Sequence, residues 1–183
     1  MRIISGEARG RKLLSPKGLE VRPTADRFRE TLFDIIGPDI RGSAFLDLFA
    51  GSGAVGIEAL SRGAESAVFV DNSPAAAKTI EKNIDLVKFW NRSLVLEADC
   101  LDALENLAGK RRTFDYIFMD PPYYQNLCQV CLDAVRELSL LRDGGLIIIE
   151  KASDEDLSPV EGFVQSRIKE YTTTTFVFFV KEE

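Results

Sequence analysis

The four consecutive residues Asp120-Pro121-Pro122-Tyr123 place an unusual set of chemical groups on one short segment. Two prolines stiffen the backbone and remove two N–H donors. The groups that remain are a carboxylate, proline carbonyl oxygens and an aromatic ring. Such an acceptor-rich surface beside a stacking platform suits a planar ligand that carries an –NH₂ group. The alternative interpretation is a Pro-rich turn that is capped by Asp and binds nothing.

A second motif lies where a predicted strand passes into a predicted helix. Gly51, Gly53 and Gly56 match the pattern G-x-G-x-x-G, whose glycines let the backbone approach a ligand closely. Asp71 ends the next predicted strand, 20 residues after Gly51, where a carboxylate can accept hydrogen bonds from ribose hydroxyls. On these residues alone, a dinucleotide-dependent oxidoreductase is one interpretation, and a tight turn without a ligand is another.

Asp47 favours a different nucleotide. It lies at the strand end, four residues before Gly51, where a carboxylate is poorly placed near a pyrophosphate and well placed near a cation. S-adenosylmethionine carries an ammonium and a sulfonium and no phosphate. Asp99 and Cys100 follow the third predicted strand, where the carboxylate could accept from an adenine amine and the Cys100 N–H could donate to the ring. Asp99 could equally be a helix N-cap.

The elements around these motifs alternate between strand-like apolar runs and helical patterns. The predicted strands cover residues 44–49, 66–71, 94–97, 114–120 and 146–150. The predicted helices cover residues 25–36, 55–61, 74–87, 101–108 and 125–138. This alternation predicts an α/β protein with a parallel, doubly wound sheet. Two adjoining strands at 165–171 and 174–180 predict an antiparallel hairpin at one edge. Ligands of such sheets bind at the carboxyl ends of the strands, where both motifs fall.

Length and composition predict one soluble globular domain over residues 1–183, with a basic arm at 1–23 and a Rossmann-like core at 24–183. Residues 1–29 carry a net charge of +5 and residues 30–183 carry −11. A basic arm on an acidic body can direct a nucleic acid to one face, although a solvated terminal segment is the alternative.

The residue types present also exclude several classes of function. Three Cys and no His predict a cytoplasmic protein without structural disulfides, and they remove His-based catalysis and the commonest metal sites. We find neither a membrane-spanning run nor a signal-peptide pattern, so we expect no membrane partner. Cys128 and Cys131 have metal-like spacing, but they lie in a helical pattern and are interpreted as buried apolar residues.

The segment Asp120-Pro121-Pro122-Tyr123 resembles the (Asp/Asn)-Pro-Pro-(Tyr/Phe) signature of methyltransferases that alkylate exocyclic or amide nitrogens. Residues 47–53 resemble the first motif of class I methyltransferases. The arm narrows the resemblance, because segments 2–6, 9–11 and 22–30 are similar to the RsmD family, whose members methylate the guanine N2 amine of a 16S ribosomal RNA nucleotide. Ser5 and Phe28 depart from the residues usual there, which affects the geometry of the arm more than the chemistry.

The resemblance implies a class I methyltransferase that uses S-adenosylmethionine, releases S-adenosylhomocysteine and needs no metal. Its partner would be small-subunit ribosomal RNA, within a 30S particle or an assembly intermediate, and the protein would be a monomer. In the implied mechanism, Asp120 and the Pro121 carbonyl accept the two amine hydrogens, and Tyr123 stacks on the flipped-out base. Alignment with the activated methyl group then supplies much of the rate.

The resemblance also implies contacts to both ligands. For the cofactor we expect Asp47, Gly51 and Gly53 at the methionine end and Asp71 at the ribose. We expect Asn72, Asp99 and Cys100 at the adenine and Thr24 at the cofactor carboxylate. For the RNA we expect Arg9, Arg11, Arg22, Arg27 and Pro122. Thr24 could instead be a helix N-cap, and Arg27 could pair with Glu30 one helical turn away.

Three other functions remain open on the sequence. The same turn serves amino-methyltransferases that act on adenine N6 of DNA or RNA, or on protein glutamine. The glycine turn with Asp71 also fits a dinucleotide-dependent oxidoreductase, but the chain offers no His and no clearly placed Lys as its catalytic partner. A non-catalytic RNA-binding factor that holds the cofactor only for structure is the third.

Overall fold

The computed structural model describes residues 1–15 and 23–182 of the chain, with side chains from residue 28 onward in the second range. The chain divides into two compact units, Met1–Ala98 and Asp99–Glu183. The single domain expected from the length of the chain stays a prediction. None of the described helices has the length and apolarity that crossing a membrane would require.

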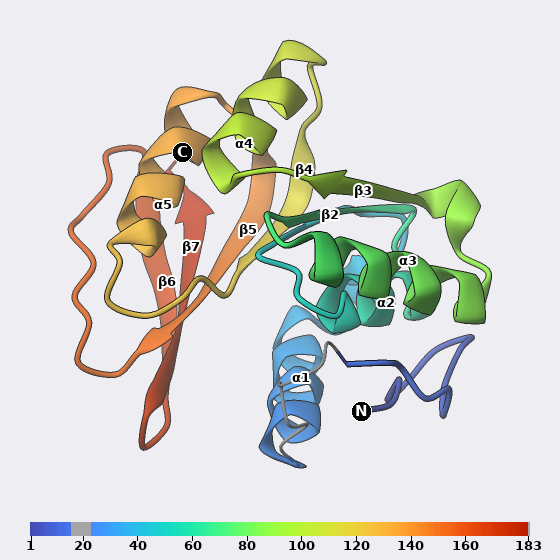
Figure 1. Ribbon diagram of the computed structural model, residues 1–183. Helices are drawn as coiled ribbons and strands as arrows, with labels where there is room; N and C mark the ends of the chain where they lie inside the picture. The colour runs from blue at the N-terminus through green and yellow to red at the C-terminus, as the bar shows by residue number, and fades with distance from the viewer. Residues whose placement is uncertain (16–22, 183) are drawn as a thin grey trace. The chain divides into compact units, whose positions relative to one another are not determined.

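The first unit contains three parallel strands in the order β3-β2-β1 (Figure 1). They are β1 (Ala44–Leu48), β2 (Ser66–Asp71) and β3 (Ser93–Glu97). Helix α2 (Ala54–Ser61) packs against β1 and β2, and α3 (Pro74–Val87) packs against β2 and β3. The remaining helical elements are α1 (Pro23–Ile36) and the short 3₁₀ helices η1 (Gly37–Ile40) and η2 (Trp90–Arg92).

Continuous apolar runs explain why these strands lie inside the unit. All five residues of β1 and the four central residues of β2 are buried, as expected of parallel strands whose two faces are covered. The register aligns Leu48 with Val70, so β1 and β2 end side by side. The loops that follow them therefore start from one edge of the sheet.

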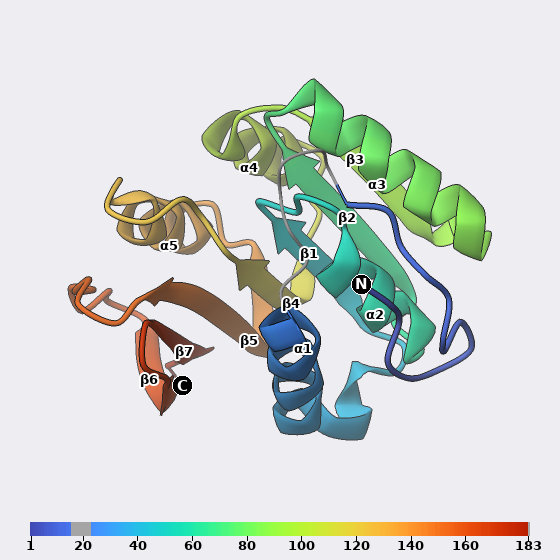
Figure 2. The same ribbon diagram turned by 60° about the horizontal axis from the view of Figure 1, so that its bottom comes forward.

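The N-terminal arm, for which the sequence allows a short hairpin or an extended segment, begins as a short hairpin. Arg2 and Lys12 form an antiparallel bridge, and the Ile3 N–H donates to the Arg11 carbonyl over 3.0 Å. Ile3 and Leu13 are buried, which ties the hairpin to the unit through its two apolar positions. Figure 2 shows this segment, in dark blue, passing α2 and continuing toward α3.

The second unit contains four strands in the order β4-β5-β7-β6. They are β4 (Phe114–Met119), β5 (Leu141–Ala152), β6 (Phe163–Glu170) and β7 (Thr174–Lys181). Strands β4 and β5 are parallel, whereas β7 is antiparallel to both β5 and β6. The helices of this unit are α4 (Cys100–Gly109) and α5 (Leu127–Glu137). The predicted mixture of parallel strands with an antiparallel C-terminal hairpin is confirmed.

Most element boundaries differ from the prediction by one or two residues, and two of the differences have structural consequences. Strand β5 begins at Leu141 and includes Asp143-Gly144-Gly145, which was expected to be a turn before the strand. The pairing with β4 shifts across this segment, and Gly144 has φ +74°, so these residues form a bulge inside the strand. Helix α1 begins at Pro23 rather than Ala25, which puts Thr24 inside the first turn instead of at the N-cap.

Candidate functional site

The glycine turn between β1 and α2 has the backbone geometry of a ligand-binding loop. Gly51 and Gly53 have φ +56° and +75°, values that residues with a side chain rarely adopt. A Cβ built on Gly51 meets nothing within 4 Å, so the backbone there is open to an approaching group. A Cβ on Gly53 would lie 3.2 Å from Ile80 Cγ2, so this glycine is also required by the packing of α3.

The third glycine serves the contact between helix and sheet. A Cβ on Gly56 would lie 2.4 Å from Cε1 of Phe69 on β2, closer than real atoms approach. The Gly56 N–H donates to Oδ2 of Asp47 over 2.8 Å, and Asp47 is buried at the end of β1. In this structure the Asp47 carboxylate therefore fixes the first turn of α2, and its predicted contact with the cofactor stays a prediction.

Asp71, at the end of β2, fixes the other side of the same turn. Its Oδ2 accepts from the Gly51 N–H over 2.8 Å, and its Oδ1 accepts from the Ser73 N–H over 2.9 Å. A carboxylate has about four lone-pair sites, so two backbone bonds leave acceptor capacity for a ribose diol. Asn72, predicted beside the adenine, follows Asp71 directly and is exposed.

Phe49 is a feature of the turn that the sequence did not reveal. This residue has φ +72°, which is a strained conformation for an aromatic side chain. It lies between the last residue of β1 and the glycines. Strain of this kind persists where neighbouring contacts fix the backbone, and here the Ala50 N–H donates to the Val70 carbonyl and Gly51 is held by Asp71.

Asp99 and Cys100 lie at the start of α4 in the second unit. Asp99 is the helix N-cap, with Oδ1 accepting from the Leu101 N–H over 3.0 Å, as the structural alternative predicted. The Cys100 side chain is buried, and a hydrogen bond from Cys131 lowers its pKa. Only the backbone N–H of Cys100 could therefore meet an adenine, since the first N–H groups of a helix have no intrahelical acceptor.

The Asp120-Pro121-Pro122-Tyr123 turn begins directly after β4. Pro121 is buried, and Pro122 and Tyr123 are exposed. The Tyr123 hydroxyl lies 3.3 Å from Oγ1 of Thr174 on β7. Its ring packs edge-on against Tyr124, with centroids 6.3 Å apart. The aromatic ring is thus held in place at the hydroxyl end while part of its surface faces solvent, which is the arrangement that base stacking requires.

Glu150 on β5 joins this turn and was not predicted as a site residue. The register pairs Met119, the last residue of β4, with Ile149, so Asp120 follows β4 beside Glu150, which lies two residues before the end of β5. Asp120 is exposed to solvent, and partial desolvation raises its pKa to about 6. Desolvation, with the Asp120 charge added, raises the pKa of Glu150 to about 8, and a hydrogen bond from Tyr123 opposes the rise.

These values mean that the carboxyl pair holds one proton near pH 7. The pair therefore offers both an acceptor and an acidic hydrogen beside a stacking surface. Sequence reasoning had the signal that could have found Glu150, because it ends the strand predicted at 146–150. What it lacked was the strand order, which determines that this strand end lies next to Asp120.

The predicted RNA contacts are described only in part. Arg9 and Arg11 lie exposed on the hairpin of the arm. Arg22 falls outside the described residues, and Thr24 and Arg27 belong to α1 but their side chains are not described. The roles of all five substrate residues and all eight cofactor residues stay predictions.

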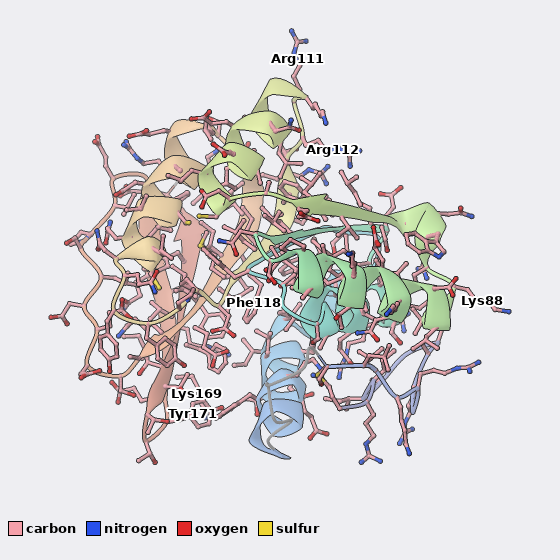
Figure 3. The ribbon with its side chains drawn as sticks, viewed as in Figure 1. Lys88, Arg111, Arg112, Phe118, Lys169 and Tyr171 are labelled. Atoms are coloured by element: carbon pink, nitrogen blue, oxygen red, sulfur yellow. The ribbon has the colours of Figure 1, made fainter. Side chains whose placement is uncertain are left out.

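Arg62, Arg111 and Arg112 lie between the predicted elements, which predicts solvated loop charges, and the structure corrects this prediction for Arg62. Arg62 donates from Nε to Oε1 of the buried Glu58 over 2.8 Å, and its guanidinium lies 4.9 Å from the centre of the Phe33 ring. Arg111 and Arg112 are exposed and point away from the second unit, in agreement with the expectation (Figure 3).

The cysteines do not form a metal site in the described chain. Cys128 and Cys131 are buried, and desolvation raises the pKa of the Cys128 thiol to about 12. Across residues 1–15 and 23–182, no group of three or more His, Cys, Asp or Glu is placed to hold a metal ion. The interpretation of these cysteines as buried apolar residues is confirmed.

Comparison with known proteins finds close relatives over the whole chain. The family model described as "Conserved hypothetical protein 95" matches residues 1–180. The Bacillus subtilis protein YlbH is 37% identical over 182 residues, with 99% of each chain covered. The "Ribosomal RNA small subunit methyltransferase D" of Haemophilus influenzae is 38% identical over 176 residues, covering 94% of this chain and 89% of the relative.

A solved structure supports the same fold. The Escherichia coli protein yhhF superimposes with a TM-score of 0.85 at 31% identity, and the match covers 100% of this chain and 98% of that one. The predicted fold class is therefore confirmed over both units.

Proposed function

Because the chain belongs to the RsmD family of ribosomal RNA methyltransferases, we propose that it transfers a methyl group from S-adenosylmethionine to the exocyclic N2 amine of a guanine in small-subunit ribosomal RNA. The observation that carries the proposal is the turn after β4. It combines a carboxyl pair, a buried proline and a restrained aromatic ring at the end of two parallel strands. These groups match the needs of an aromatic amine, which are acceptors for its hydrogens and a surface for its ring.

The residues of the first unit fit the proposed methyl donor. Gly51 leaves its backbone open on the Cβ side, and Asp71 keeps acceptor capacity beyond its two backbone bonds. We assign Gly51, Gly53 and Asp47 to the methionine end and Asp71 to the ribose. Asn72 of the first unit is assigned to the adenine, and so are Asp99 and the Cys100 N–H, which belong to the second unit. The donor supplies a methyl group already activated by its sulfonium, so the protein needs to position the acceptor rather than activate the donor.

Positioning is what the second unit supplies in this proposal. The lone pair of the guanine N2 amine is delocalised into the ring, which makes the amine a poor nucleophile. Hydrogen bonds from the amine to Asp120 and to the Pro121 carbonyl would hold both hydrogens and direct the lone pair toward the methyl group. The new N–C bond forms as the S–C bond breaks, and the electron pair of the broken S–C bond stays on sulfur. One amine proton then leaves, with Asp120 as the nearest acceptor.

The target base must leave its stack to reach this turn. Tyr123 provides the stacking surface, and Pro122 provides a further exposed apolar face. Arg9 and Arg11 on the hairpin, with Arg22 and Arg27, are proposed to hold the RNA backbone, and each phosphate contact should make binding more sensitive to salt. We propose a cytoplasmic monomer that acts on the RNA within a 30S particle or an assembly intermediate.

The reaction can be tested with labelled S-adenosylmethionine and three acceptors. These are naked small-subunit RNA, 30S particles that lack the modification, and unmodified DNA. The product is digested to nucleosides and the labelled nucleoside is identified. N2-methylguanosine from the ribosomal samples alone is the expected result. Label in N6-methyladenosine, in DNA or in protein would overturn the assignment of the substrate while keeping the fold and the cofactor.

The role of Asp120 needs a variant and a matched control. Asp120→Ala should keep S-adenosylhomocysteine affinity and lose at least about 100-fold in transfer rate, a loss typical of removing a proton acceptor. Asp143→Ala is the control, because it also deletes a carboxylate from this unit. Asp143 lies in the bulge at the opposite end of β5 and pairs with Lys181 on the surface. Equal activity of the two variants would refute the proposed role of Asp120.

A further inference from the structure

Asn83 is a buried amide that joins two parts of the first unit with different proposed ligands. It lies on α3 and is fully buried. Its Nδ2 donates to the Ser52 carbonyl over 2.8 Å and to the Leu14 carbonyl over 3.0 Å. Its Oδ1 accepts from the Leu14 N–H over 2.7 Å. Ser52 lies between the two glycines of the ligand turn, and Leu14 lies at the end of the hairpin.

The rest of the hairpin is anchored to the helix that follows the same turn. Glu58 on α2 accepts from the N–H groups of Ile4 and Ser5 over 2.8 and 2.9 Å. Ser61 accepts from the Ala8 N–H over 3.0 Å. Helix α2 begins at the glycine turn. The arm is thus docked on the two helices, α2 and α3, that also determine the position of the turn.

From residues 1–15, the described part of the arm, two contacts lead to the turn. One is the Asn83 bridge, and the other is the Ser52 hydroxyl, which donates to the Met1 sulfur over 3.8 Å. A thioether is a weak acceptor, so the amide is the stronger link. A buried amide group that loses its hydrogen-bond partner keeps the cost of its desolvation without compensation. Displacing either Leu14 or Ser52 from Asn83 therefore carries an energetic penalty.

We propose that Asn83 is a positioning residue that couples the cofactor turn to the RNA-binding arm, so that S-adenosylmethionine and RNA bind cooperatively. This inference rests on the proposed function, which assigns the two ligands to these two segments. A bound cofactor fixes the backbone at Ser52, and the Asn83 amide is then held in the orientation that bonds Leu14. Because the arm is ordered by the same bridge, RNA binding requires less further ordering. Linkage requires the effect to be reciprocal.

The coupling is measured by titrating S-adenosylhomocysteine into the full chain with and without a small-subunit RNA fragment. We expect the RNA to lower the dissociation constant of wild type by about 5-fold or more, the low end of typical coupling. Asn83→Leu removes all three bonds at similar volume, and the factor should fall to near one. Leu14→Pro removes only the Leu14 donor and leaves the Ser52 contact intact. It should lower the coupling factor with little change in cofactor affinity measured alone, because the Leu14 carbonyl can still accept from Asn83.

Ser61→Ala is the matched control. It weakens the docking of the hairpin on α2 without touching Ser52 or Asn83. It should lower RNA affinity and keep the coupling factor. Two results would overturn the inference. One is a coupling factor of one in wild type when both ligands bind, and the other is a coupling factor that is unchanged in both Asn83→Leu and Leu14→Pro.

Hydrogen exchange gives a readout that needs no RNA. The amides of Ile3, Gly10 and Leu13 bond within the hairpin, and saturating S-adenosylhomocysteine should slow their exchange in wild type but not in Leu14→Pro. If the cofactor binds and this protection is absent, the coupling is refuted even where the methylation assay succeeds. If the protection is present but no RNA is methylated, the coupling stands and the proposed substrate is wrong.

Discussion

Replacing Glu150 by Gln should make the stability of the protein less dependent on pH. Burial beside Asp120 raises the pKa of Glu150 from 4.5 to about 8. An acid with a higher pKa in the folded state binds its proton more tightly there. Its contribution to stability is full below about pH 4.5 and is lost as the pH rises through about 8.

The size of the effect follows from the shift. One pKa unit corresponds to about 1.4 kcal/mol, so a shift of this size implies roughly 3–5 kcal/mol of stability lost between pH 4 and pH 9. Asp120 shares part of this change, because the two carboxyl groups titrate as a pair. Gln keeps the shape and the neutral state that Glu150 has at pH 7. The substitution therefore removes the loss at high pH without removing the hydrogen-bonding capacity of the side chain.

The assay is urea denaturation of both proteins at pH 5, 7 and 9. We expect Glu150→Gln to gain about 2–4 kcal/mol relative to wild type between pH 5 and pH 9, within the range set by the shift. Titrating groups other than Asp120, which is coupled to Glu150, act equally on both proteins and cancel in the difference. Glu161→Gln, an exposed position just before β6, should follow wild type at every pH. Parallel curves for wild type and Glu150→Gln would refute the raised pKa of Glu150.

Four further outcomes follow from the structure. Gly56→Ala should lower the free energy of unfolding by about 1–3 kcal/mol in a urea titration, because its Cβ would lie 2.4 Å from Phe69. Asp71→Asn should weaken S-adenosylhomocysteine binding at least about 10-fold by calorimetry, because it weakens two charge-assisted bonds that shape the turn. The methyl-transfer kcat/KM should fall as the pH drops through about 6, where Asp120 gains its proton. The Glu161→Gln variant should show the same fall in kcat/KM. Arg9→Ala should reduce the slope of log RNA affinity against log salt by about one.

Local patterns predicted the elements and the glycine turn because their causes lie within a few residues. Ser73 before Pro74 predicted the start of α3, and the structure shows the Ser73 hydroxyl accepting from the Ala76 N–H. The apolar runs of β1 and β2 predicted buried parallel strands. Boundaries were less predictable, as at α1, where Pro23 occupies the first position of the helix.

Features that depend on distant neighbours were missed. Arg62 was interpreted as solvated because the sequence does not show that Glu58 and Phe33 surround it. Glu150 was missed because only the register between β4 and β5 places it beside Asp120. In the sequence Asn83 is an ordinary residue of a predicted helix, and only the structure shows that the arm lies beside it. In each case the deciding partner lies on another element, at a separation that a pattern search does not cover.

The spacing of 20 residues between Gly51 and Asp71 has a structural cause that does not involve a ligand. Asp71 ends the strand that pairs with β1, so its carboxylate reaches the turn after β1 and bonds the Gly51 N–H. Any protein in which two adjacent parallel strands end in this way can form the same hydrogen bond, whether it binds a dinucleotide or S-adenosylmethionine. The spacing therefore cannot choose between these ligands. The choice depends on Asp47, whose carboxylate bonds the Gly56 N–H of the same turn, because a further negative charge beside the turn disfavours a pyrophosphate and favours a cation.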